Sequence, residues 1–199
     1  TDDRNLNVTG KVINNGAIVV SENAFMRVYG APSGVENNGI ITNNGDMYIV
    51  WNNANTFVNK GVITNNGNID LTDVIDLEDA TGNITNDRTG SIVNNGTIEG
   101  TESLITGEGY LKAVFSAGMF YGSIADAMSS TSTGIRLYGD FSSGSNNITL
   151  STSGQPAKDR IYLAPGAEYT GTVTYGTTEA GDAQNYVSVT INATNTSDA

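Results

Sequence analysis

The residues of this chain that are best suited to chemistry form an acidic run in its first half. Asp70, Asp73, Asp76 and Asp79 recur at spacings of three, with Glu78 among them. Carboxylate oxygens of this kind are the ligands that Ca²⁺ prefers. The run lacks the alternating Asp and Asn spacing and the terminal Glu of an EF-hand loop. Asp70, Asp73, Asp76 and Asp79 are therefore candidate calcium ligands, against the plainer interpretation of a solvated loop, and we expect no other cofactor.

Two absent residue types limit the possible reactions. The chain contains no His and no Cys, which excludes a Ser-His-Asp triad, a Cys-His pair and a His-based zinc site. Hydrolysis by two carboxylates that flank a glycosidic bond stays open, as does a lyase that uses calcium and an Arg or Lys base. The nine basic residues form no recognisable motif. We therefore expect a protein that is not an enzyme, with a polysaccharide lyase or glycoside hydrolase as the alternative.

One outward-facing column supplies the candidate ligand-binding residues. Side chains alternate between faces along a strand, and Val19, Tyr48, Asp70 and Glu99 fall between positions that are mostly apolar. Their mixed chemistry predicts that they face solvent, and Tyr48, Asp70 and Glu99 are the candidate glycan contacts. Trp51 shares the parity of the apolar positions, which predicts core packing in preference to sugar stacking.

Charge and hydropathy restrict the partners and the location. The formal net charge of −12 repels nucleic-acid phosphates and anionic lipid. The chain lacks the ~18 consecutive apolar residues that a membrane-spanning helix needs, and its first residues do not have the pattern of a signal peptide. We expect a glycan, a host-surface molecule or neighbouring domains of a larger surface protein as partners, with no nucleic acid and no membrane insertion.

The elements that must position these residues come from an internal repeat. The phrase Gly, any residue, Val or Ile, a β-branched residue, Asn, Asn, Gly occurs four times, closing at Gly16, Gly45, Gly67 and Gly96. The mean step is about 27 residues, in the range of solenoid repeats. Apolar pairs continue at similar steps in two later series: Ile135/Leu137, Ile161/Leu163 and Val187/Val189, then Ile148/Leu150 and Val173/Tyr175. We predict one domain over residues 1–199, with repeat coils in 1–100 and looser coils, suited to capping, in 101–199.

Each phrase predicts a strand, a turn and a second strand. One interior column would hold Val12, Ile41, Ile63 and Ile92, and another, six residues on, Ile18, Met47, Ile69 and Ile98. By parity, the first Asn of each pair would stack in a buried amide ladder: Asn14, Asn43, Asn65 and Asn94. The second would lie at the corner: Asn15, Asn44, Asn66 and Asn95. The best candidate for a helical turn is 123–130.

The recurrence of Asn decides between two architectures. Asn-Gly alone is a hairpin signal, so a meander of hairpins is the competing interpretation. Stacked Asn side chains about 4.8 Å apart can hydrogen-bond amide to amide, which favours a solenoid. Repeat steps of unequal length and the general handedness of parallel crossovers favour a right-handed coil. The prediction is an all-β, right-handed parallel β-helix (β-solenoid) with coils of about 22–29 residues, seven or eight in all.

The repeat resembles a known class of sequence. The pattern Asn-x-Gly-x-Ile-x-Asn-Asn-Gly-x-Ile, present at 59–69 and at 37–47 with Met last, is similar to repeats in bacterial surface β-helices of the filamentous-haemagglutinin and autotransporter-passenger type. Residues 161–173 also look like passenger sequence. The resemblance covers residues 8–100 well and implies a secreted or cell-surface location and a role as an adhesin or structural stalk, with glycan binding as one form of it. It transfers no catalytic residue.

Overall fold

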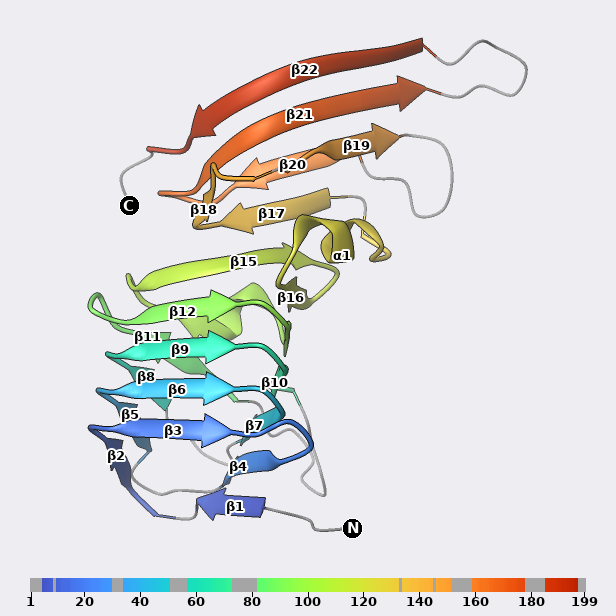
Figure 1. Cartoon of the computed structure of the whole chain (residues 1–199). Coiled ribbons are helices and arrows are strands. Elements are labelled where there is room, and N and C mark those ends of the chain that lie inside the picture. The colour runs from blue at the N-terminus through green and yellow to red at the C-terminus, as the bar shows by residue number, and fades with distance from the viewer. Residues whose placement is uncertain are drawn as a thin grey trace. The chain divides into compact units, whose positions relative to one another are not determined.

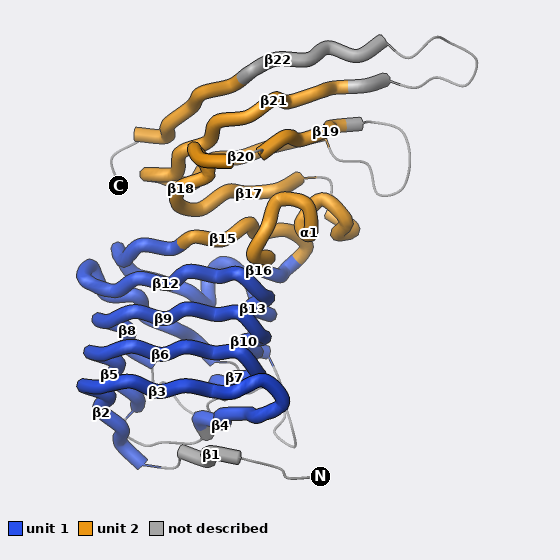
Figure 2. The backbone as a smooth tube through the Cα atoms, in the orientation of Figure 1, with its two compact units in different colours: residues 1–111, 118–120 blue, residues 112–117, 121–199 orange. Residues whose placement is uncertain are grey.

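The structure, a computed structural model, is nearly all β. It describes residues 5–8, 10–29, 34–50, 57–72, 82–132, 134–144, 146–151, 159–177 and 185–196, without the side chains of 5–8, 29, 50, 151, 176–177 and 185–190. Contacts within the chain divide it into two compact units, residues 1–111 with 118–120 and residues 112–117 with 121–199 (Figure 2).

The first unit is a solenoid whose coils supply three stacks of parallel strands, called here sheets 1, 2 and 3. Sheets 2 and 3 join through β15 (Tyr110–Ser116) and β16 (Met119–Tyr121) into one 13-stranded sheet. Sheet 1 contains, in order, β2 (Val12–Asn14), β5 (Val35–Asn37), β8 (Phe57–Asn59), β11 (Ile84–Asn86) and β14 (Ile105–Thr106). Sheet 2 contains β3 (Ala17–Val20), β6 (Ile40–Asn43), β9 (Val62–Asn65) and β12 (Ser91–Asn94). Sheet 3 contains β1 (Asn5–Val8), β4 (Phe25–Tyr29), β7 (Asp46–Val50), β10 (Asn68–Asp70) and β13 (Thr97–Glu99).

The coils advance from the N-terminal end as a right-handed helix (Figure 1). This confirms the predicted parallel β-solenoid and rejects the meander of hairpins, since the pairings between coils of the first unit are parallel. The solenoid has about six turns, fewer than the seven or eight predicted, because antiparallel pairing appears in the second half.

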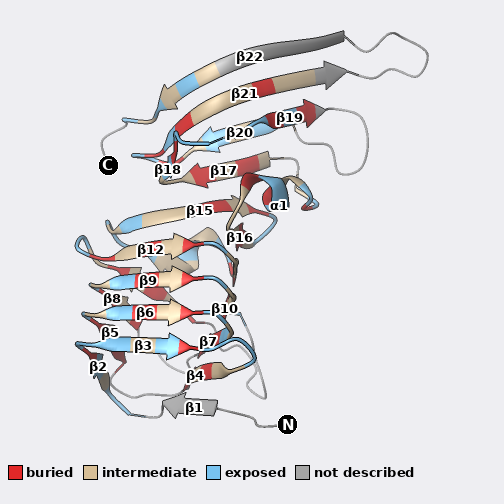
Figure 3. Cartoon of the chain, viewed as in Figure 1, coloured by how far each residue is buried: buried red, intermediate tan, exposed pale blue. Residues whose placement is uncertain are grey.

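Alternation of side chains builds the interior of the first unit. Ile41, Ile63 and Ile92 stack in sheet 2, and Met47, Ile69 and Ile98 stack in sheet 3, each of them fully buried. Figure 3 shows the result as bands of buried residues that repeat from strand to strand. Burial of a side chain of this size contributes about 1.5–3 kcal/mol relative to exposure, so these columns drive the stacking of the coils.

The first copy of the phrase stacks differently from the prediction. Asn14 pairs with Asn37, and Val12 with Val35, so neither shares a column with the residues of the other three phrases. Ile18 pairs with Ile41 in sheet 2 and therefore lies outside the Met47 column of sheet 3. Asn stands both at the corner between sheets 1 and 2 and at the corner between sheets 2 and 3, as Asn37 and Asn43 do in the second coil. The first phrase occupies the corner between sheets 1 and 2, whereas the later three occupy the corner between sheets 2 and 3.

Two buried amide ladders result, in place of the one predicted. In the first ladder, each Nδ2 donates to the Oδ1 of the next coil at 2.7–2.8 Å, from Asn14 through Asn37 and Asn59 to Asn86. In the second, Asn43 donates to Asn65 and Asn65 to Asn94, both at 2.7 Å. The predicted burial of the Asn43, Asn65 and Asn94 amides is thereby confirmed.

The second Asn of each pair is exposed at a corner, as predicted, and these residues also form ladders. Asn38 Nδ2 donates to Asn15 Oδ1 at 3.0 Å. At the other corner, Asn66 donates to Asn44 and Asn95 donates to Asn66, both at 2.8 Å. Donation therefore runs toward the N-terminal coils in the exposed ladders and away from them in the buried ladders.

The second buried ladder ends at an unsatisfied atom. Asn43 Oδ1 is buried without a hydrogen-bond partner among the described residues. The residue that stacks beneath Asn43 is Val20, which has no side-chain donor. A buried acceptor without a donor costs about 1–3 kcal/mol, so this end of the ladder is a local weak point.

The second unit mixes parallel and antiparallel pairs. β15 (Tyr110–Ser116), which begins in the first unit, pairs antiparallel with β17 (Gly134–Tyr138), and β17 pairs parallel with β20 (Arg160–Leu163). β21 (Glu168–Thr177) pairs with three strands: β18 (Asp140–Phe141), β19 (Ile148–Ser151) and β22 (Asn185–Thr194). η1 (Glu102–Leu104) and most of β16 (Met119–Tyr121) belong to the first unit, whereas α1 (Ile124–Met128) belongs to the second unit. Its core includes Val114, Ile135 and Leu137.

The strand pairs of this unit test the two predicted series of apolar pairs. Ile135/Leu137 align with Ile161/Leu163, and Ile148/Leu150 with Val173/Tyr175, as expected for successive coils. Val187 and Val189 instead face Tyr175 and Val173 across the antiparallel β21–β22 pair. The prediction that they continue the first series is therefore wrong. The predicted helical turn is present as α1, with Ser123 as its N-cap.

Candidate functional site

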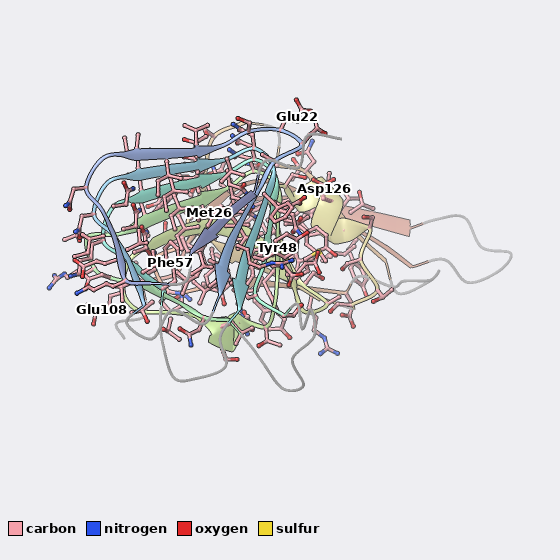
Figure 4. The ribbon with its side chains drawn as sticks, turned by 90° about the horizontal axis from the view of Figure 1, so that it is seen from below. Glu22, Met26, Tyr48, Phe57, Glu108 and Asp126 are labelled. Carbon is pink, nitrogen blue, oxygen red and sulfur yellow. The ribbon has the colours of Figure 1, made fainter. Side chains whose placement is uncertain are left out.

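The outer surface of sheet 3 holds the predicted ligand-binding residues. Tyr48, Asp70 and Glu99 are aligned in register on β7, β10 and β13. Met47 and Ile69 on the same strands are fully buried, so their neighbours point outward. Figure 4 looks along the stack and shows Met26 and Phe57 within the ring of strands and Tyr48 on its outer side.

Arg27, and not Val19, completes this column. Arg27 on β4 aligns with Tyr48, whereas Val19 lies on β3 and aligns with Thr42 in sheet 2. The prediction that Val19 shares the column is therefore wrong. The first phrase forms the corner that precedes sheet 2, whereas the later three precede sheet 3, so equal spacing from the phrase places Val19 on the wrong strand.

A second outward column lies beside the first. Its members occupy alternate positions of the same strands and align in register: Phe25, Asp46, Asn68 and Thr97. We call the two columns together the Tyr48 face, made of Phe25, Arg27, Asp46, Tyr48, Asn68, Asp70, Thr97 and Glu99. Sequence reasoning missed Phe25 and Arg27, although their alternation with the buried residues of β4 was a usable signal.

Aromatic and cationic groups gather at the N-terminal end of the Tyr48 face. The rings of Phe25 and Tyr48 lie edge to face, with centroids 6.0 Å apart and planes at 87°. Arg27 Cζ is 5.6 Å from both ring centroids. Among the described residues, Arg27 makes no hydrogen bond or ion pair with a protein acceptor. Stacking on the rings therefore holds the guanidinium and leaves its N–H donors for other acceptors.

Polar groups occupy the C-terminal end of this face. Asn68 Nδ2 donates to Glu99 Oε1 at 3.1 Å, and Thr97 Oγ1 donates to Asn68 Oδ1 at 2.8 Å. Asp70 Oδ1 accepts from the backbone N–H of Thr72 at 2.7 Å and from its hydroxyl at 2.9 Å. Asp70 is buried, at 8% exposure, so Tyr48 and Glu99 are the more accessible of the three predicted residues.

The predicted calcium ligands fall mostly outside the described part of the chain. Asp73, Asp76 and Asp79 lie there, as does Trp51. Asp70 is described, and its Oδ1 binds Thr72 in a local turn. No group of three His, Cys, Asp or Glu residues that could hold a metal ion occurs among the described residues. The calcium hypothesis stays a prediction.

A second Arg–aromatic arrangement lies in the second unit. Arg136, Tyr138 and Tyr162 line a shallow hollow of about 260 Å³ together with residues 163–165. Arg136 Cζ is 5.6 Å from the Tyr162 ring centroid, and Tyr162 is 45% exposed. The sequence analysis did not select these residues. The alternation of Arg136 with buried Ile135 and Leu137 on β17 was the available signal.

Comparison with known proteins adds no family to this description. Family models, curated proteins and solved structures each give no match to the chain. The resemblance of the repeat to bacterial surface adhesins stays a prediction. Within the described residues, no helix has the length and hydropathy needed to cross a membrane.

Proposed function

We propose that this chain is a non-enzymatic domain of a secreted or cell-surface protein, in which the β-solenoid acts as an adhesin or stalk and binds glycans through the Tyr48 face. The observation that carries the proposal is the alignment on one outer sheet of an aromatic pair, a stacked guanidinium and a row of amide, hydroxyl and carboxylate groups. Sugars offer apolar C–H faces and many hydroxyls, which these two halves of the face match.

The geometry favours a sugar over other partners. An aromatic side chain buries large area with little loss of side-chain entropy, and its polar neighbours fix orientation. Arg27 donates to hydroxyl or ring oxygens, while Glu99 and Asp46 accept from hydroxyls. Because the chain carries a formal charge of −12, a neutral glycan meets less repulsion than a polyanion. Nucleic acid and anionic membrane are disfavoured for the same reason.

The direct test is a glycan array with three proteins. Wild type is expected to bind at least one neutral glycan, and Tyr48→Ala to lower that affinity by about tenfold or more, as loss of a central aromatic contact does. Tyr110→Ala is the matched control, because Tyr110 is 44% exposed and lies on β15. Equal loss in both variants, or a blank array for wild type, would overturn glycan binding at this face.

The lyase or glycosidase alternative has one observation in its favour. Asp70 and Glu99 are neighbours in register, and two carboxylates about 5–5.5 Å apart are the arrangement of a retaining glycosidase. Incubation of wild type with pectin, glucan and alginate, followed by assays for reducing ends and unsaturated products, separates the cases. Product formation that Glu99→Gln abolishes would replace the binding proposal with an enzymatic one.

A further inference from the structure

The N-terminal end of the first unit presents two strand edges. β2 and β3 are the terminal strands of sheets 1 and 2, whereas sheet 3 extends one strand further, to β1, which pairs with β4. Each coil contributes one strand to each sheet, so β1 belongs to a turn beneath β2, β3 and β4. The two other places of that turn are empty among the described residues.

Backbone groups at this edge are available for pairing as far as the described residues show. Gly16 O and Val20 O accept from Ile40 N and Asn44 N of the next coil, both at 2.8 Å. Because successive residues of a strand direct their backbone groups to opposite sides, Ala17 and Val19 direct theirs away from β6. An edge of this kind is a template for another strand.

The side chains at this edge have apolar surface and hydrogen-bonding groups that a further coil of the same kind would cover and pair. Val12 and Ile18 are half-buried, while Ile41, directly above Ile18, is fully buried. Asn14 Oδ1 accepts only from the Gly16 N–H, at 3.1 Å, among the described residues, so one lone pair remains. The Asn15 amide accepts from Asn38, which leaves its Nδ2 to donate. The buried ladder thus offers an acceptor and the exposed ladder a donor.

Gly16 shows that the matching space is open. A Cβ on Gly39 would lie 2.1 Å from Gly16 O, and one on Gly61 would lie 2.0 Å from Gly39 O. A Cβ on Gly16 would meet nothing within 4 Å. The glycine contact that repeats between successive coils therefore lacks its lower partner at Gly16.

We propose that the β2–β3 edge is a docking surface for one further coil of the same kind: a strand, an Asn-Asn-Gly corner and a second strand, in parallel register beneath Val12–Val20. This inference concerns assembly and is independent of glycan binding at the Tyr48 face. The partner is specified by an amide donor beneath Asn14, an amide acceptor beneath Asn15 and a corner whose backbone carbonyl lies beneath Gly16, as Gly16 O lies beneath Gly39.

The test is to supply that coil. The nine residues Val35–Asn43 are fused in front of Thr1, so that residues 1–4 separate them from β1 as Ser21–Ala24 separate β3 from β4. The fusion is expected to slow amide hydrogen exchange at Ala17 and Val19 by at least about tenfold and to raise the melting temperature by roughly 5 °C. The same nine residues in scrambled order serve as the control.

Gly16→Ala gives the proposal a second, independent test. In the unextended chain the substitution is expected to leave the melting temperature unchanged or slightly higher, since the new methyl has open space. In the fusion it is expected to cancel the protection of Ala17 and Val19, because the methyl meets the added corner. Unchanged exchange in the fusion, or insensitivity of the fusion to Gly16→Ala, would overturn the proposal. So would a dimer of the unextended chain in which these amides are already protected.

Discussion

Replacement of Gly61 by Ala tests whether the corner glycines set the distance between coils. A Cβ on Gly61 would lie 2.0 Å from Gly39 O, 2.8 Å from Asn38 C and 2.9 Å from Gly39 N, whereas ordinary contact begins at 3.4 Å. These are backbone atoms, which no side-chain rotation can move. Neither Gly61 nor Gly16 has a φ in the left-handed region, so the clash between coils is the only new strain.

The expected cost follows from three terms. Overpacking costs about 1–3 kcal/mol, and at a backbone contact the upper value applies. Separation of the corners weakens the bond from Val62 N to Gly39 O, now 2.9 Å, at about 1 kcal/mol. Ala loses less chain entropy on folding, which offsets about 0.4–1 kcal/mol. Gly61→Ala should therefore lower the free energy of unfolding by about 3 kcal/mol, whereas Gly16→Ala retains only the favourable last term.

Guanidinium denaturation followed by far-ultraviolet circular dichroism measures the difference between the two variants. Coils of a solenoid contact mainly their neighbours, so unfolding can depart from two-state behaviour. Amide exchange of Val62, next to the substituted corner, supplies a local measurement. The reasoning is refuted if Gly61→Ala stays within about 0.5 kcal/mol of wild type, or if Gly16→Ala destabilises the protein as much.

Three further predictions concern the ladders and one ion pair. Asn65→Ala should destabilise the protein by about 2–4 kcal/mol and exposed Asn66→Ala by less than 1, in the same denaturation assay. Val20→Asn should leave the protein more stable than Val20→Ala does, since its amide supplies the donor that the ladder oxygen above it lacks; the reverse order contradicts this. The hydrogen bond from Lys60 holds the pKa of Glu36 below its ordinary 4.5, so stabilisation by this pair is present above pH 4.5 and disappears as pH falls through the folded-state pKa. In an NMR titration, Lys60→Met should raise the Glu36 midpoint; an unchanged midpoint rejects this assignment.

The fold was predictable because one chemical constraint repeats along the sequence. Asn recurs at the corners since a stacked amide both donates and accepts, which a stacked carboxylate cannot do. That reasoning correctly buried Asn65 and aligned Tyr48 with Glu99. It misplaced Asn14, because Asn-Asn-Gly can form either corner, as 37–39 and 43–45 do in the second coil, and the sequence does not say which corner a single copy occupies.

The rest of the site depends on turn lengths and strand directions, which the repeat pattern does not specify. Arg27 enters the Tyr48 column only because the first coil inserts Ser21–Ala24 before β4, and turn length between strands varies without a sequence rule. The antiparallel pairing of β21 with β22 could not be predicted either. Apolar residues alternate in the same way in parallel and in antiparallel strands, so the pattern does not give the direction of a strand. Periodicity predicts which face a residue occupies, and not which strand lies beside it.

The opposed directions of the amide ladders have an electrostatic consequence. In an α-helix, peptide dipoles add head to tail and leave partial charges at both ends. Here the buried amides of Asn37 and Asn65 point their N–H groups toward the C-terminal coils, and the exposed amides of Asn38 and Asn66 point theirs toward the N-terminal coils. The two sets of side-chain dipoles oppose each other, so each added coil adds less to the field at the ends of the stack than ladders of one direction would. A growing stack of this kind therefore gains less polarisation than a helix, whose peptide dipoles all point the same way.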